Sequence, residues 1–254
     1  MKRFVQTIPR ITTRGYYDLE TGRKLKNNSY YLYPKKSFKN LYGKKEITIM
    51  IHGLRNNKAA ATNKFIIAKR RLKKLGYHYP VIGYSYDSNT KGAHIKKTAL
   101  KALRAGQRIA KQNGCNLAQF IIDFKQQSPI TKIRLMGHSL GTELILSTIE
   151  KLAKKQTNKN IIEGVYFFGA SVGSNIANPS QYGKMMEKIV KSKIKNFYSP
   201  ADEVLKQSQI EGSVKNLLGL TGAKGKTISK YSQIKVFPKN HSFASYALVL
   251  KSFP

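Results

Sequence analysis

One serine of this 254-residue chain lies in a pattern that is typical of a catalytic nucleophile. Gly137-His138-Ser139-Leu140-Gly141 matches Gly-x-Ser-x-Gly; the residues before it, 132–137, predict a buried strand, and residues 140–155 predict a helix. A nucleophile on such a sharp turn needs small neighbours, because backbone segments approach each other closely there. The N-terminus of the following helix also directs free N–H groups at the place where an oxyanion would develop. The pattern therefore predicts nucleophilic chemistry at Ser139.

A second Gly-x-Ser-x-Gly match, Gly169-Ala170-Ser171-Val172-Gly173, is the rival within the same chain. It also follows a predicted strand, over residues 161–170. A loop that contains Pro179 comes next, in place of an immediate helix. We therefore favour Ser139 and expect Ser171 to be a small residue at a strand end that packs near the site.

The order of residues along the chain selects the partners of Ser139, since a nucleophile on this kind of turn is followed first by an acid and then by a histidine. Of the five histidines, only His241 comes after Ser139. Asp202 is the sole Asp beyond Ser139, and it follows a predicted strand at 194–199. The carboxyl end of a strand is where such sheets hold catalytic groups. Glu203 is the alternative acid, and capping the next helix is a second, compatible role for Asp202.

Apolar strand patterns alternate with helical ones from residue 46 onward, which predicts an α/β fold: a mostly parallel central sheet with helices on both faces. The predicted strands are 46–53, 79–86, 132–137, 161–170, 194–199 and 234–237. The predicted helices are 58–75, 93–127 with a break near Asn113-Gly114, 140–155, 182–191, 204–218 and 242–250. Residues 1–45 are rich in Tyr and Lys and predict an antiparallel edge hairpin of the same domain, whose core is 46–254.

Four segments of residues 46–254 together resemble the α/β-hydrolase superfamily. They are Ile51-His52-Gly53-Leu54, the segment around Ser139, Tyr198-Ser199-Pro200-Ala201-Asp202-Glu203-Val204-Leu205 and Asn240-His241-Ser242-Phe243. The Gly-His-Ser-Leu-Gly segment is similar to that of lipase-like and esterase-like members. The resemblance implies a Ser139, His241 and Asp202 triad with an acyl-enzyme intermediate, and an oxyanion hole from the backbone N–H groups of Leu54 and Leu140. It implies no particular substrate, and we expect a small-molecule or lipid acyl group.

The charge of the chain is its strongest compositional feature. With 47 Lys and Arg against 12 Asp and Glu, the net charge is +35, whereas a magnitude of about 2–8 suits a small domain. Most of the cations are Lys, which attract diffusely and do not read base edges as Arg does, so sequence-specific DNA recognition is disfavoured. The charge favours a substrate that is acidic or lies on an anionic surface. It also supports an alternative function, a catalytically vestigial hydrolase-fold protein that binds nucleic acid or an anionic membrane through Lys-rich faces.

Other functional classes are disfavoured by what the sequence lacks. Cys115 is the only cysteine, so no intrachain disulfide can form. No apolar run reaches the ~18 residues of a membrane span, and the N-terminal residues lack the apolar core of a secretory signal, so we expect a cytoplasmic protein. The histidines do not form a His-x-x-x-His pair, and the Gly-Lys residues at 221–226 lack phosphate-loop spacing. We therefore expect neither a metal nor a cofactor.

Overall fold

The computed structural model describes residues 8–210 and 214–254, and within these ranges it forms one eight-stranded sheet of order β2-β1-β4-β3-β5-β6-β7-β8. The strands are β1 (Arg10–Thr12), β2 (Tyr31–Tyr33), β3 (Glu46–Ile51), β4 (Val81–Ser85), β5 (Lys132–His138), β6 (Ile162–Phe168), β7 (Val190–Tyr198) and β8 (Tyr231–Lys235). All neighbours are parallel except β1 and β2, which are antiparallel at one edge. The predicted α/β fold with an N-terminal antiparallel edge is confirmed.

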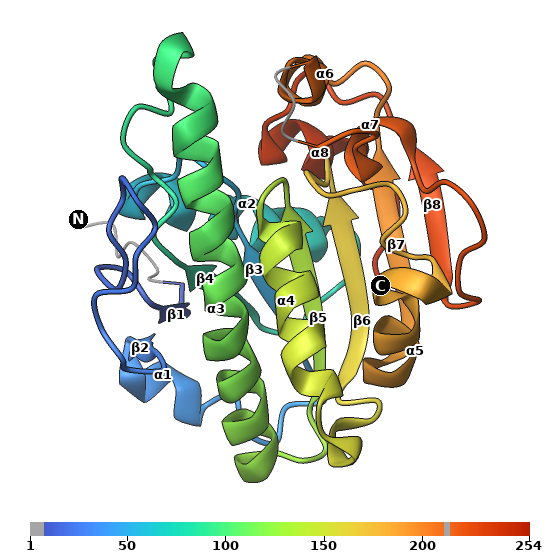
Figure 1. Cartoon of the computed structure of the whole chain (residues 1–254). Helices are drawn as coiled ribbons and strands as arrows, with labels where there is room; N and C mark the ends of the chain where they lie inside the picture. The colour runs from blue at the N-terminus through green and yellow to red at the C-terminus, as the bar shows by residue number, and fades with distance from the viewer. Residues whose placement is uncertain (1–7, 211–213) are drawn as a thin grey trace.

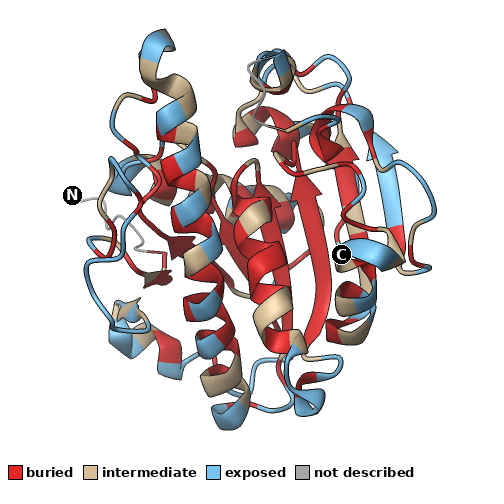
Figure 2. Cartoon of the chain, viewed as in Figure 1, coloured by how far each residue is buried: buried red, intermediate tan, exposed pale blue. Residues whose placement is uncertain are grey.

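Helices cover both faces of this sheet, as Figure 1 shows, with α3, α4 and α5 on the side of the viewer and α2 behind. The helices are α1 (Lys35–Lys39), α2 (Lys58–Lys74), α3 (Ala99–Gln127), α4 (Gly141–Ala153), α5 (Lys184–Ile189), α6 (Glu203–Ile210), α7 (Leu218–Thr221) and α8 (Phe243–Val249). The central strands are buried throughout, as the red ribbons of Figure 2 show, because a covered parallel sheet exposes neither face to water. One apolar core lies under α3 and α4, and a second lies under α2 and α8.

The parallel strands bring their carboxyl ends to one edge of the sheet, the upper edge in Figure 1, where α6 and the beginning of α3 also lie. We call this the carboxyl edge. Gly137 of β5 pairs with Ile51 of β3, and His138 pairs with Phe168 of β6. The loops that follow β3 and β6 therefore lie on either side of Ser139.

The predicted break near Asn113-Gly114 is wrong, because α3 runs through both residues without interruption. Gly114 permits a close helix contact, since a Cβ there would lie 2.4 Å from the Ser147 hydroxyl oxygen of α4. The Asn113 side chain is buried and accepts hydrogen bonds from the hydroxyls of Thr13 and Tyr84. These tertiary contacts outweigh the weak helix propensity of Asn and Gly.

The predicted helix over 204–218 is also wrong over part of its length. The helix α6 ends at Ile210, residues 211–213 lie outside the described ranges, and Asn216 adopts a φ of 53° that breaks a right-handed helix. Further boundaries differ from the prediction, and α3 begins at Ala99 and not at residue 93. The strand β7 begins at Val190, which shortens the helix before it, and β8 covers Tyr231–Lys235 as an exposed edge strand.

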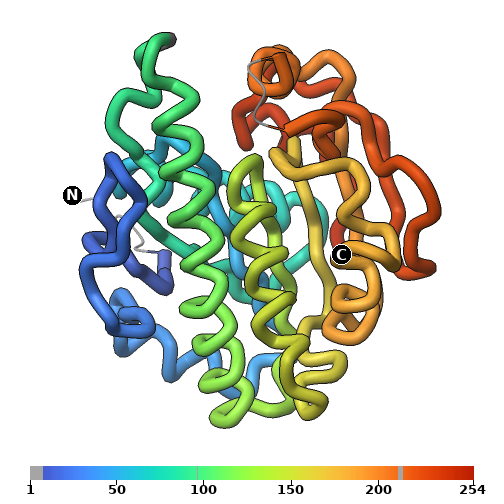
Figure 3. Tube along the Cα trace, viewed as in Figure 1, coloured from blue at the N-terminus to red at the C-terminus, as the bar shows by residue number. Residues whose placement is uncertain are grey.

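The N-terminal segment lies beside the beginning of α3, as the blue and green traces of Figure 3 show. Asp87, which follows β4, fixes this segment. Its carboxylate accepts hydrogen bonds from the backbone N–H groups of Gly15, Tyr16 and Tyr17 at 3.0–3.1 Å. The N-terminal segment, although distant in sequence, is thereby held next to the loop that follows β3.

Candidate active site

Ser139 occupies a strained turn between β5 and α4. Its φ is 52°, in the left-handed region that L-residues rarely adopt, and its N–H donates to the carbonyl of Phe168 at 2.9 Å. A Cβ at Gly141 would lie 2.6 Å from the carbonyl oxygen of Ile51. Because residue 141 is glycine, the turn can pack directly against β3. The Ser139 side chain then projects from the edge of the sheet.

His241 lies between Ser139 and Asp202 and contacts both side chains. Its Nε2 is 2.9 Å from the Ser139 Oγ, and its Nδ1 is 2.7 Å from the Asp202 Oδ2. A carboxylate only accepts hydrogen bonds, so Nδ1 carries the proton and Nε2 is the acceptor for the serine hydroxyl. The structure brings together the three side chains that the sequence selected, from loops after β5, β7 and β8.

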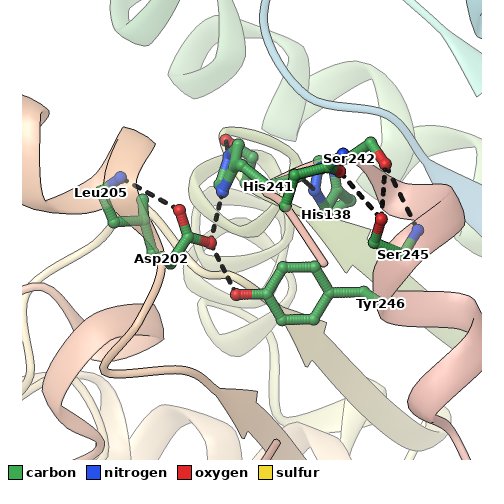
Figure 4. A network of polar contacts seen from close by, with 9 residues as sticks. His138, Asp202, Leu205, His241, Ser242, Ser245 and Tyr246 are labelled. Carbon is green, nitrogen blue, oxygen red and sulfur yellow. Dashed lines mark hydrogen bonds and ion pairs between the residues drawn. The ribbon is translucent and has the colours of Figure 1, made fainter. Parts of the chain in front are cut away.

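The Asp202 carboxylate has three donors, which Figure 4 shows as dashed lines. Besides His241, the Tyr246 hydroxyl donates to Oδ2 at 2.7 Å, and the Leu205 N–H donates to Oδ1 at 3.2 Å. Burial opposes ionisation of this carboxyl, but the hydrogen bonds outweigh it and hold the pKa of Asp202 below its ordinary value. The bond to Leu205 also caps α6, so both predicted roles of Asp202 fit its contacts.

The alternative acid, Glu203, points away from the site. Its side chain is 79% exposed and pairs with Lys206 at 2.7 Å. Asp202 is thus the acid that reaches His241.

His138, the residue before Ser139, ties the turn to the loop that carries His241. It is buried, and its Nε2–H donates to the carbonyl of His241 at 2.8 Å. Burial and the neighbouring His241 hold the pKa of His138 well below its ordinary value, so the ring is neutral. Ser242 then caps α8 through the Ser245 N–H, which fixes the chain on the other side of His241.

The turn after β3 lies directly against the Ser139 side chain, because a Cβ at Gly53 would be 2.9 Å from the Ser139 Cβ. The Asn56 amide group fixes this turn by donating to the carbonyls of Gly53 and Leu54. Within the described ranges, the N–H groups of Leu54 and Leu140 donate to no protein acceptor. Both residues expected to form an oxyanion hole therefore have a free donor at the carboxyl edge.

His52 and Arg14 hold the turn after β3 in place through hydrogen bonds. The His52 ring is fully buried, stacks on Tyr86 and donates from Nδ1 to the carbonyl of Gly53 at 3.0 Å. Burial and the Arg14 charge lower the pKa of His52 to about 3, so its Nε2 is free to accept from Arg14 at 3.3 Å. Arg14 also donates to the carbonyls of Asn56 and Asn57.

Sequence reasoning missed Arg14 and Tyr246. Arg14 comes from the edge segment and Tyr246 from the last helix, and neither belongs to a recognisable motif. The predicted rival, Ser171, follows β6 as a half-buried residue, and a loop comes after it. The described residues contain no group of three or more His, Cys, Asp or Glu side chains that could hold a metal ion.

A mostly parallel sheet with a serine, an acid and a histidine in the loops after β5, β7 and β8, at its carboxyl edge, defines an α/β-hydrolase fold. Residues 35–236 match a family described as α/β-hydrolases of unknown function (DUF900), which is most of the chain, and the protein belongs to this family. No curated protein matches the chain. No helix among the described residues is long and apolar enough to cross a membrane.

Solved structures resemble the chain only distantly. A Trichoderma reesei cutinase in complex with a phosphonate inhibitor is 18% identical, with 62% of this chain and 67% of the cutinase covered and a TM-score of 0.35. A lipase-esterase related protein from Clostridium acetobutylicum is 12% identical, with 82% and 90% covered and a TM-score of 0.39. A cutinase-like protein from Cryptococcus sp. is 10% identical, with 80% and 86% covered and a TM-score of 0.41.

Proposed function

We propose that this protein is a serine hydrolase that cleaves a carboxylic ester or thioester through Ser139, His241 and Asp202. The supporting observation is the hydrogen-bond chain in which His241 contacts the Ser139 Oγ at 2.9 Å and the Asp202 Oδ2 at 2.7 Å. This arrangement matches what general-base activation of a serine requires. Membership of an α/β-hydrolase family agrees with it.

The chemistry follows from the two nitrogens of His241. Nε2 takes the Ser139 proton as Oγ attacks the acyl carbon, and the imidazolium then protonates the departing alcohol or thiol as its bond to the acyl carbon breaks. His241 next removes a proton from water, which attacks the acyl carbon of the acyl-enzyme, and then returns that proton to the Ser139 Oγ as the ester bond breaks and the acid leaves. Asp202 stabilises the imidazolium in both half-reactions without accepting its proton.

The N–H groups of Leu54 and Leu140 would stabilise the negative charge that develops on the acyl oxygen. Leu140 is the N-cap residue of α4, so the helix dipole supports the same charge. Removal of one donor of this kind costs about 10²–10³-fold in kcat in serine hydrolases. The fixed position of the Leu54 turn is therefore as important to the proposal as the side chains of the triad.

The substrate that this proposal favours is an acyl group in an acidic molecule or on an anionic surface. Every lysine whose burial the structure describes is at least partly exposed, whereas Glu46, Asp87, Glu163 and Asp202 are buried. The solvent-facing charge is therefore strongly positive, and it would raise the local concentration of an anionic substrate.

A fluorophosphonate probe together with a chain-length series of p-nitrophenyl esters tests the proposal. We expect the wild type to be labelled and to hydrolyse esters, and Ser139→Ala to lose both properties. Ser171→Ala is the matched control, since it removes the rival serine, and it should keep both. Labelling that survives in Ser139→Ala would overturn the assignment of the nucleophile.

Absence of hydrolysis on every ester and thioester, with no labelling, would favour the alternative of a vestigial site on a protein that binds polyanions. That outcome would contradict the proposed hydrolysis but would not change the assignment of the fold.

A further inference from the structure

Exposed apolar side chains lie next to each part of the candidate active site. Val204 comes two residues after Asp202, and Phe237 comes four residues before His241. Ile95 follows His94, whose ring contacts the guanidinium of Arg55 beside Leu54. We call Ile95, Val204, Ile210 and Phe237 the apolar rim, and all four are exposed.

The apolar rim is not a continuation of the core. On α6, Leu205 is buried while Val204 and Ile210 are 55% and 78% exposed, so the helix turns one apolar face inward and leaves other apolar side chains in water. Val236 is likewise buried while its neighbour Phe237 is 69% exposed. Apolar groups from two separate loops and a helix, which follow the carboxyl ends of β4, β7 and β8, thus face solvent at one edge of the sheet.

Cations accompany the apolar rim. Lys235 lies 5.5 Å from the centre of the Phe237 ring, and Lys97, Lys239 and Arg55 are exposed in the same segments. The segments that carry these residues contain a single acid, Glu203, and Lys206 pairs with it. These segments, all described by the structure, are residues 54–58, 91–97, 203–210 and 231–240. A positively charged region that also exposes apolar side chains is complementary to a bilayer surface, where anionic headgroups cover the hydrocarbon.

We propose that the apolar rim docks this protein on an anionic lipid surface, with Phe237, Val204 and Ile210 entering the headgroup region. Exposed aliphatic side chains gain nothing from a nucleic acid, whose affinity comes from phosphate contacts and base stacking, but they gain apolar burial in a bilayer. The inference rests on the proposed function in one respect, that docking would bring an acyl substrate to Ser139. Docking itself requires no catalysis.

The absence of tryptophan from the chain permits a direct test. Phe237→Trp places a single reporter on the apolar rim, and Ile130→Trp places one at a residue that is 75% exposed just before β5, at the opposite edge of the sheet. Ile130 also has lysines nearby, Lys125 and Lys132 in sequence, so charge alone does not distinguish the two sites. Both substitutions are at exposed side chains that the fold does not need.

We expect vesicles of phosphatidylglycerol and phosphatidylcholine to shift the emission of Phe237→Trp to the blue and brominated lipids to quench it. Ile130→Trp should show neither change, and pure phosphatidylcholine should produce little of either. An unchanged emission of Phe237→Trp, or an equal response of the two variants, would overturn the proposal. An equal blue shift with duplex DNA would do so as well, since it would indicate general polyanion binding.

Vesicle sedimentation of a serine variant adds an affinity measurement. Phe237→Ser should weaken binding to the anionic vesicles by about tenfold, the loss expected for one large apolar group, while Ile130→Ser should bind as the wild type does. Equal binding of these two variants would contradict the proposal. Repeating the measurement in Ser139→Ala separates the two hypotheses, because docking should survive there even if no ester is ever found to be hydrolysed.

Discussion

The hydroxyl of Tyr246 donates a 2.7 Å hydrogen bond to the same Asp202 oxygen that faces His241. Tyr246 is fully buried, and burial together with the Asp202 charge raises its pKa far above the ordinary range, so the hydroxyl remains a donor at every working pH. The last helix of the chain thus holds the acid of the candidate triad through the same carboxylate oxygen that His241 contacts.

Tyr246→Phe should lower kcat while leaving the fold intact, because it removes only one donor to Asp202. A hydrogen bond to a charged group contributes about 1.5–3 kcal/mol, so we expect a decrease in kcat of about tenfold or somewhat more. Asp202→Asn should be far more damaging, by about 10⁴-fold in a triad of this type. Ester hydrolysis measures both, and equal losses would show that Tyr246 does more than orient the carboxylate.

Ser139→Gly should be more stable than Ser139→Ala, although both lack the nucleophile. The left-handed φ of 52° costs an L-residue about 1–2 kcal/mol but costs glycine nothing. Glycine loses roughly 0.5–1 kcal/mol through its freer unfolded state, which leaves a net advantage of up to about 1.5 kcal/mol. Urea denaturation compares the two variants directly, and a more stable alanine variant would argue against strain at this turn.

Arg14→Ala should lower kcat with little effect on KM, because the contacts of Arg14 are to His52, Asn56 and other groups that hold the turn that carries Leu54. The decrease in kcat should not exceed about 10²–10³-fold, which is the loss that follows removal of one oxyanion donor. Free guanidinium at a concentration that does not denature the protein should restore part of kcat in Arg14→Ala. Arg23→Ala is the control, since Arg23 is exposed in the same segment; equal activities of the two variants would refute the positioning role.

The protein should lose stability as the pH falls from about 6.5 to about 3. The pKa of His52 is about 3 in the folded protein and about 6.5 in an unfolded chain, so in this range the unfolded state binds the extra proton. The free energy of unfolding should then fall by about 1.4 kcal/mol per pH unit from His52. His138 acts in the same direction, since its pKa is also lowered.

Urea unfolding at pH 7, 6 and 5 measures this slope. His52→Gln should flatten it, whereas His78→Gln, at an exposed histidine, should leave it unchanged. A wild type that is as stable at pH 5 as at pH 7 would contradict the prediction.

The elements that carry the candidate triad could be predicted because their signals are local. Ile133, Leu135 and Met136, in the strand before Gly137, are apolar and buried, since strands covered on both faces admit few polar residues. The order of Ser139, Asp202 and His241 then restricted the choice, with one histidine and one aspartate beyond the serine. The break placed at Asn113-Gly114 failed for the opposite reason, because a packing contact with Ser147 and buried hydrogen bonds decide that helix, and local propensity cannot report them.

The sequence by itself determined the fold class, the residues of the candidate triad and the excess of positive charge, since these depend on residue types, order and short-range periodicity. Only the tertiary structure decided which side chains hold that triad, because Arg14 and Tyr246 meet His52 and Asp202 across separations of 38 and 44 residues. It also decided where the unpartnered apolar residues gather, since strand direction brings Val204 and Phe237 to the edge that holds Ser139. Contacts between distant segments arise from packing of the whole sheet, and no local pattern encodes them.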